Sequence, residues 1–155
     1  MMLHYADCRS FAAGAASYLY RPAVAGDTTA RIMLPVEINR IPILALVDTG
    51  APYVVCTPEI AESLNLDPAL ALEAAELAWH GKLTGHLYLL PITLKAERGE
   101  SLPVNATVFV PDAASAAAWA YERRPFVLGL GCLSKIRFAV DFEDDTFYFG
   151  RLGQV

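Results

Sequence analysis

The chain has 155 residues, of which 55% are hydrophobic and 19% are charged, and its formal net charge is −5. A length of roughly 100–200 residues corresponds to one domain, and this composition excludes an intrinsically disordered chain, because disorder requires low hydrophobicity and high charge. Lys and Arg form no cluster larger than the pair Arg123-Arg124. We therefore expect no nucleic-acid partner, since phosphate binding needs concentrated positive charge.

Three cysteines are widely spaced along the chain: Cys8, Cys56 and Cys132. An odd number at these spacings fits neither a disulfide framework nor a zinc site, so we expect free thiols, a cytoplasmic location and no metal or cofactor. No apolar run approaches the roughly 18–20 residues of a membrane helix, and no membrane partner is expected. The run 11–20 and the small residues after it leave secretion as an alternative, although a signal peptide needs a more basic start.

The sequence divides into an irregular N-terminal lead-in over residues 1–30 and a folded domain over residues 31–155. Residues 31–37 partly alternate in hydrophobicity and predict a strand, which Pro35 restricts to an edge or an end. Residues 41–47 form a nearly continuous apolar run, which is typical of a strand buried on both faces.

Beyond this run, the sequence predicts short strands and helices separated by turns. Residues 70–77 are rich in Ala and Glu, which favours a helix. Residues 79–94 carry glycines around Lys82-Leu83-Thr84 and predict a hairpin with its tip there. Turn, cap and alternation signals give the other expected elements: a turn over 48–52, a strand over 53–56, helices over 58–64 and 113–122, a strand over 104–110, an apolar run at 126–130, a helical turn over 132–136, and a terminal hairpin of 137–142 and 146–149.

The triplet Asp48-Thr49-Gly50 is the feature that carries chemistry. It follows a buried apolar strand and precedes another short strand, where a polar loop conflicts with the packing and therefore marks a candidate functional site. Two other Asp-Thr pairs, at 27–28 and 145–146, lack the glycine. The competing interpretation is that Asp48 only begins a tight turn, because Asp and Gly are both common turn residues.

Two segments resemble the signatures of the retropepsin-like aspartic proteases. Residues 45–55 (Ala-Leu-Val-Asp-Thr-Gly-Ala-Pro-Tyr-Val-Val) resemble that family's active-site loop, and residues 126–133 (Phe-Val-Leu-Gly-Leu-Gly-Cys-Leu) resemble its second signature. The hairpin predicted over 79–94 lies where the family places its flap. The resemblance covers residues 31–149 in the right order, without the lead-in and the alanine-rich stretch 113–124.

This resemblance implies a mostly β fold, namely a closed, mostly antiparallel retropepsin-like (acid protease) β-barrel with one to three short helices. It also assigns roles to residues, with Asp48 as the catalytic group. The active-site loop is completed by Thr49, Gly50 and Ala51. Support for that loop from below comes from Val127, Leu128 and Gly129. The flap tip that closes over a substrate peptide is assigned to Trp79, His80 and Gly81.

An aspartic protease needs two carboxylates that share one proton, so that one activates water while the other polarises the scissile carbonyl. The chain has one Asp-Thr-Gly, so a two-fold homodimer with one Asp48 from each subunit is the economical solution, and the resemblance implies the same arrangement. We therefore expect an aspartic endopeptidase that acts on extended polypeptides. The alternative is a catalytically inactive module that keeps this fold for dimerisation or peptide binding.

Other residues have competing interpretations. His80 and His86 are interpreted as solvated, because the further ligands that a metal site needs are not evident. For Trp79, the alternative to a substrate contact is an anchor in the core or in an interface. Residues 127–129 are also compatible with an ordinary core strand that enters a turn.

Overall fold

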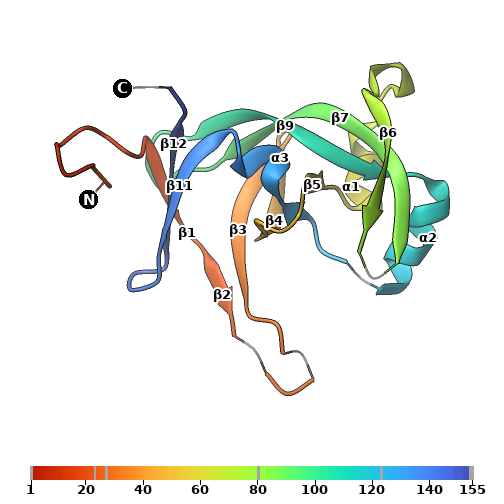
Figure 1. The fold of residues 1–155 in the computed structure, drawn as a ribbon, viewed down its shortest axis with the longest axis horizontal. Coiled ribbons are helices and arrows are strands. Elements are labelled where there is room, and N and C mark those ends of the chain that lie inside the picture. Colours follow the sequence, from red (N-terminus) through yellow and green to blue (C-terminus); the bar gives the residue numbers. More distant parts are fainter. Residues whose placement is uncertain (1, 23, 27, 80, 123, 154–155) are drawn as a thin grey trace.

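The structure is a computed structural model that describes residues 2–22, 24–26, 28–79, 81–122 and 124–153 (Figure 1). Within these residues the chain forms twelve β-strands, three α-helices and one 3-10 helix. The predicted fold class, mostly β with one to three short helices, is confirmed. Among the described helices, none has the length and apolar character that crossing a membrane requires.

The strands follow one another in this order: β1 (Gly14–Ser17), β2 (Leu19–Arg21), β3 (Arg31–Ile38), β4 (Ile41–Val47), β5 (Val54–Val55), β6 (Glu73–Ala78), β7 (Lys82–Leu94), β8 (Arg98–Gly99), β9 (Leu102–Pro111), β10 (Val127–Leu128), β11 (Ile136–Asp141) and β12 (Thr146–Arg151). The helices are α1 (Pro58–Leu64), the 3-10 helix η1 (Pro68–Leu70), α2 (Ala113–Glu122) and α3 (Leu130–Leu133). The expected cap of α1 is present, because the Thr57 side chain accepts a hydrogen bond from the Ile60 amide.

The large sheet has the strand order β2-β3-β4-β10-β5-β9-β7-β6, with an additional pairing between β3 and β7. This pairing places Ile38 opposite both Ile41 of β4 and Ile92 of β7, so the sheet curves back on itself through β3. Most neighbours are antiparallel, whereas β4–β10 and β5–β9 are parallel. The sheet is therefore mostly antiparallel, with parallel pairings confined to the short strands next to residue 48.

Pro35 occupies a gap in the pairing of β3. On one side β4 pairs with residues 33–38 of β3, whereas on the other side β2 covers residues 31–33 and β7 covers residues 36–38. Proline is tolerated in a sheet where its missing N–H costs no ladder bond. Pro35 itself therefore has a partner strand on one side only, as the prediction requires, although β3 as a whole has neighbours on both sides.

The core consists of two main hydrophobic clusters on either side of β9. Every second residue of β9 from Leu102 to Val108 is buried in the larger cluster, as the alternation of this segment predicts. Phe109 contributes instead to a second cluster, which lies beneath the β6–β7 hairpin and contains these other buried residues: Val55, Leu77, Leu83, Leu87, Trp119 and Val127. The second cluster therefore joins that hairpin to α2 and β10.

The lead-in is more ordered than the sequence indicates. The expectation of an irregular segment over residues 1–30 is wrong for residues 14–21, which form β1 and β2. Antiparallel pairing joins β1 to β12 and to β8, and Ala15 and Ala16 are buried there. Small residues give weak strand propensity, so only the distant partner strands specify this structure. The β2–β3 and β11–β12 hairpins project from the same side of the body (Figure 1).

The helix expected over residues 70–77 is absent, and residues 73–78 form the strand β6 instead. Each residue of β6 is paired with β7, from Glu73 opposite Leu87 to Ala78 opposite Lys82. Helix propensity is a weak preference that tertiary context overrides. Here the pairing with β7 and the burial of Leu77 decide the conformation.

Two of the cysteines are core residues. Cys56 and Cys132 are buried, and burial raises the pKa of each thiol to about 12. A thiol with so high a pKa is not a nucleophile near neutral pH. Both residues therefore serve packing, whereas Cys8 is exposed.

Candidate active site

Asp48 begins the loop that follows β4. Its backbone amide donates to the carbonyl of Leu128 over 3.2 Å, and its carbonyl accepts from the Ala51 amide over 3.3 Å. The Gly50 amide donates to Oδ1 of Asp48 over 2.8 Å. The side chain is exposed. The loop backbone therefore fixes the direction of a carboxylate that remains accessible to solvent.

Strand β10 lies between the two strands that flank this loop. Val127 and Leu128 pair in parallel with Leu46 and Val47 of β4, and Val127 also pairs with Val55 of β5. The two residues of β10 are fully buried. Because β10 lies between the strands that enter and leave the loop, it holds both ends of the loop at a fixed separation. The structure thus brings the predicted supporting residues directly to Asp48.

The Gly129 backbone lies so close to the Asp48 loop that a residue with a side chain would not fit at this position. A Cβ atom at this position would lie 2.1 Å from the carbonyl oxygen of Tyr53 and 2.7 Å from that of Ala51. Its φ of −97° is accessible to all residues, so the requirement for glycine is one of space. The next amide, of Leu130, donates to the Ala51 carbonyl over 2.8 Å. The backbones of the two signature segments are therefore in direct contact.

The β6–β7 hairpin turns between Ala78 and Lys82, before the residues 82–84 that the glycine pattern indicates as its tip and in the region where the resemblance places the flap tip. Ala78 pairs with Lys82, the Trp79 amide donates to the Gly81 carbonyl over 2.8 Å, and Gly81 has a φ of +117°. Glycine is the residue that adopts such a φ without strain. Trp79 and Gly81 thus lie at the hairpin tip, and His80 lies outside the described residues.

A pocket of about 110 Å³ lies between this hairpin and the Asp48 loop. Its walls come from the loop, from the hairpin and from the strands beneath: Asp48, Gly50, Ala51, Pro52, Val55, Leu77, Ala78, Trp79 and Val127. Apart from Asp48, the lining side chains are apolar. The loop, its support and the flap are separate segments of the sequence. Residues from all three therefore meet around one cavity.

Asp48 also lies in the wall of a larger hollow of about 480 Å³. The two aromatic side chains in its wall, Tyr20 and Phe142, are 50% and 64% exposed. No sequence signal indicated these residues, because Tyr20 belongs to the lead-in and Phe142 to the terminal hairpin. Their position beside Asp48 follows only from the fold.

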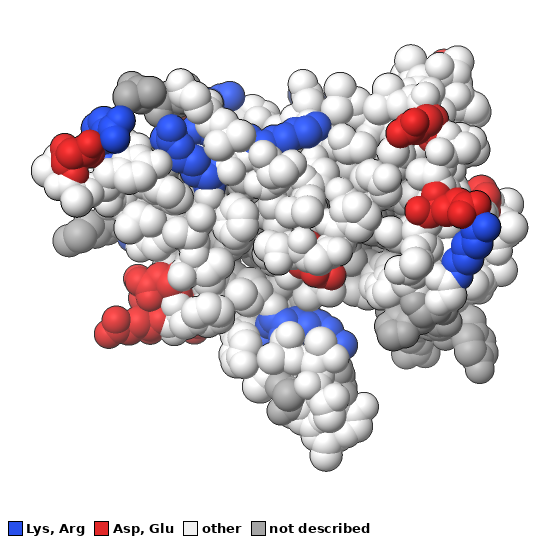
Figure 2. Space-filling view, in the orientation of Figure 1, with Lys and Arg blue, Asp and Glu red and all other residues white. Residues whose placement is uncertain are grey.

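The remaining candidates are exposed. Thr49 lies in the loop beside Asp48 and is exposed. His86 is exposed on β7, and no cluster of His, Cys, Asp and Glu suited to a metal occurs among the described residues. Charged side chains form separate spots on a largely uncharged face (Figure 2).

Comparison with known proteins supports the resemblance. Residues 34–108 match the family model of aspartyl proteases, and this segment contains the Asp48 loop and the β6–β7 hairpin. The segment around the first signature is therefore similar to aspartyl proteases. The second signature, at 126–133, lies beyond the matched residues.

Two solved structures are similar to the chain. A retropepsin-like aspartic protease from Rickettsia conorii is 18% identical with a TM-score of 0.49, and the alignment covers 89% of this chain and 95% of that chain. The retroviral protease-like domain of Ddi1 from Leishmania major is 16% identical with a TM-score of 0.45, and the alignment covers 81% and 98%. No curated protein matches the sequence significantly.

Proposed function

We propose that the protein is a homodimeric aspartic endopeptidase in which each subunit contributes one Asp48 to a shared catalytic pair. The observation that carries this proposal is the exposed Asp48 carboxylate on a loop braced by β10, facing an apolar pocket beneath the β6–β7 hairpin. The match of residues 34–108 to the aspartyl protease family supports the same chemistry.

The proposed reaction needs no covalent intermediate. Two carboxylates a few ångströms apart share one proton, because both cannot readily carry a charge. The ionised Asp48 takes a proton from water, and the water oxygen attacks the scissile carbonyl carbon. The protonated Asp48 of the other subunit donates to the carbonyl oxygen. The carboxyl that received the water proton then passes it to the amide nitrogen, while the other carboxylate takes a proton from a hydroxyl of the tetrahedral intermediate. The C–N bond breaks, which releases a carboxylic acid and an amine and leaves the pair singly protonated.

A second copy of the chain is the proposed source of the second carboxylate. The sequence contains one Asp-Thr-Gly, and the related pair Asp145-Thr146 lies at the β11–β12 turn without the glycine. Tyr20 and Phe142 supply exposed aromatic surface in the hollow next to Asp48. A two-fold axis close to Asp48 would necessarily bring a partner near this surface, and covering aromatic side chains favours association.

The substrate proposed for this site is an extended polypeptide that lies between the Asp48 loop and the hairpin. The pocket of about 110 Å³ is lined by apolar side chains and has room for one apolar substrate side chain. Gly50, which lies in its wall, gives a substrate backbone access to the loop. Hairpin closure would exclude water from the reacting bond.

We expect cleavage of an unfolded polypeptide between about pH 4 and 7, where a carboxylate pair can be singly protonated. Mass spectrometry of the products detects this cleavage, and sedimentation measures whether the particle has twice the chain mass of 16.8 kDa. Polypeptide binding without cleavage across this pH range would instead favour the inactive binding module. A monomeric mass under conditions of full activity would contradict the shared pair.

A further inference from the structure

The β6–β7 hairpin is attached to α2, a helix within the stretch 113–124 that neither signature includes. We propose that α2 and the segment after it form a latch that positions the hairpin over the Asp48 loop. The latch consists of Asp112, Ser115, Trp119 and Arg124, and it acts on Thr84 and Trp79 of the hairpin. Its structural role is independent of activity, whereas its effect on catalysis rests on the proposed function.

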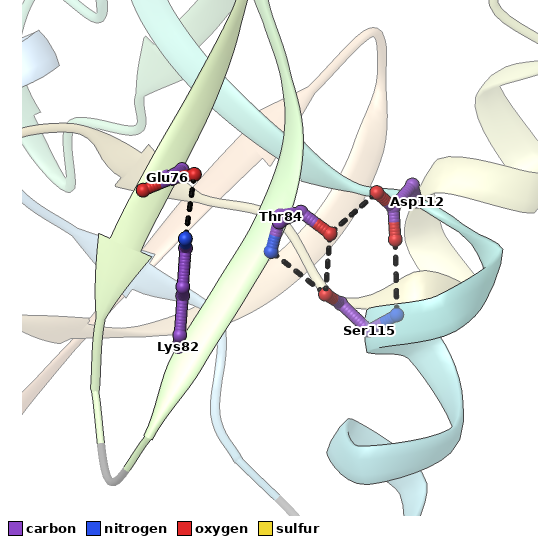
Figure 3. Close-up of polar contacts among 5 residues, drawn as sticks. All are labelled: Glu76, Lys82, Thr84, Asp112 and Ser115. Carbon is purple, nitrogen blue, oxygen red and sulfur yellow. Dashed lines mark hydrogen bonds and ion pairs between the residues drawn. The ribbon is translucent and has the colours of Figure 1, made fainter.

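The polar half of the latch begins where β9 ends. Pairing between β7 and β9 extends to Gly85, opposite Pro111. One residue closer to the hairpin tip, the Thr84 amide donates to Oγ of Ser115 over 2.8 Å (Figure 3). Ser115 is buried. The first turn of α2 thus provides a hydrogen-bond partner for β7 at the point where the pairing with β9 has ended.

Asp112 joins the same contact to the start of α2. Its Oδ2 accepts from the Thr84 hydroxyl over 2.6 Å, and its Oδ1 accepts from the Ser115 amide over 3.0 Å, as expected of a helix cap (Figure 3). The Asp112 amide donates to the Thr84 carbonyl over 3.0 Å. The hydrogen bonds from the Thr84 hydroxyl and the Ser115 amide lower the pKa of Asp112 from its ordinary 3.8. These hydrogen bonds therefore favour the ionised form of the Asp112 carboxylate.

The aromatic half of the latch holds the hairpin tip itself. The rings of Trp79 and Trp119 meet edge to face, with centroids 5.5 Å apart and planes at 86°. The Arg124 guanidinium lies 5.2 Å from the Trp79 ring centroid and 5.8 Å from that of Trp119. Trp119 Nε1 donates to the Arg124 carbonyl over 3.0 Å. Trp119 and Arg124 are 2% and 7% exposed, so the tip packs against a buried platform.

The position of Trp79 connects the latch to the site. Trp79 forms part of the wall of the pocket that also contains Asp48. If the hairpin moved away, Trp79 would lose its contacts with both Trp119 and Arg124. Because a two-stranded hairpin is marginally stable by itself, the latch sets how often the pocket opens. Ser115 and Trp119 are therefore positioning residues, which act on the site through Thr84 and Trp79.

Hydrogen exchange of the full chain tests the structural part of this proposal. We expect Ser115→Ala and Trp119→Phe to accelerate exchange of the amides at 78–84 about tenfold, as local opening becomes easier. Amides of β11–β12 should be unaffected. Glu76→Gln is the matched control, because Glu76 forms an exposed ion pair with Lys82 in the same hairpin, outside the latch (Figure 3). Unchanged exchange at 78–84, or equal acceleration throughout the chain, would overturn the latch.

Steady-state kinetics test the consequence for catalysis. The two latch variants should lower kcat/KM measurably, by at most the factor by which hairpin exchange rises, since kcat/KM follows the fraction of chains with a closed hairpin. Their pH profile should match that of the wild type, because Asp48 is unchanged. Faster hairpin exchange with unaltered kcat/KM would overturn the catalytic role. If the wild type cleaves nothing, the proposed function fails, while the exchange experiment still decides the structural role.

Discussion

Replacing Asp48 with Asn is expected to lower kcat about 10³-fold or more, because the amide can neither take a proton from water nor share one with the partner carboxylate. The fold should survive this change. Asp48 is exposed, and an Asn Oδ1 can still accept the hydrogen bond from the Gly50 amide. We expect the free energy of unfolding to change by less than about 1 kcal/mol.

The measurement is cleavage of a peptide substrate, together with urea denaturation of the same preparation. Asp144→Asn is a suitable control, since Asp144 is an exposed residue at the β11–β12 turn and the substitution removes the same charge. This control should retain wild-type activity. Substantial hydrolysis by the Asp48→Asn variant would rule out the proposed chemistry.

Replacing Gly129 with Ala has the second large expected effect, and it acts on stability and activity together. The new Cβ would meet the Tyr53 carbonyl oxygen at 2.1 Å and the Ala51 carbonyl oxygen at 2.7 Å. Both contacts are with backbone, which cannot move without shifting the Asp48 loop. Overpacking of this kind costs about 1–3 kcal/mol. We expect a lower urea midpoint and loss of most of the catalytic activity, even where the variant remains folded.

Leu130→Ala provides the comparison for this substitution. Leu130 is the adjacent residue, and its side chain is 40% exposed. Its truncation removes little packing, so stability and activity should stay close to those of the wild type. A Gly129→Ala variant with an unaltered urea midpoint and unaltered activity would show that the loop and the second signature are not in the close contact described above.

The Asp48 loop could be predicted from the sequence because its signals are local. A buried apolar strand ends at Val47, turn residues follow, and the second signature repeats the pattern of apolar residues ending in Gly129. The pairing of β10 between β4 and β5 gives this pattern a physical meaning. The requirement for glycine at 129 comes from the approach of another backbone segment, so its cause is visible only in three dimensions.

Strand β6 could not be predicted, because its Ala and Glu residues favour a helix locally while its pairing partner lies beyond the turn. The residues that surround the site could not be predicted either, because they come from distant parts of the sequence. Tyr20 and Phe142 reach Asp48 from opposite ends of the sequence, and Trp119 reaches Trp79 through α2. No periodicity or motif connects such residues. The sequence therefore indicated the catalytic candidate, while the fold supplied its surroundings.

A subunit-mixing experiment tests the shared Asp48 pair most directly. Wild-type chains are mixed with an equal amount of Asp48→Asn chains, subunits are allowed to exchange, and hydrolysis is compared with that of the same total amount of wild type. In a shared pair, only dimers with two Asp48 residues are active, so about one quarter of the activity should remain. About one half, the value for chains that each carry a complete site, would contradict the shared pair.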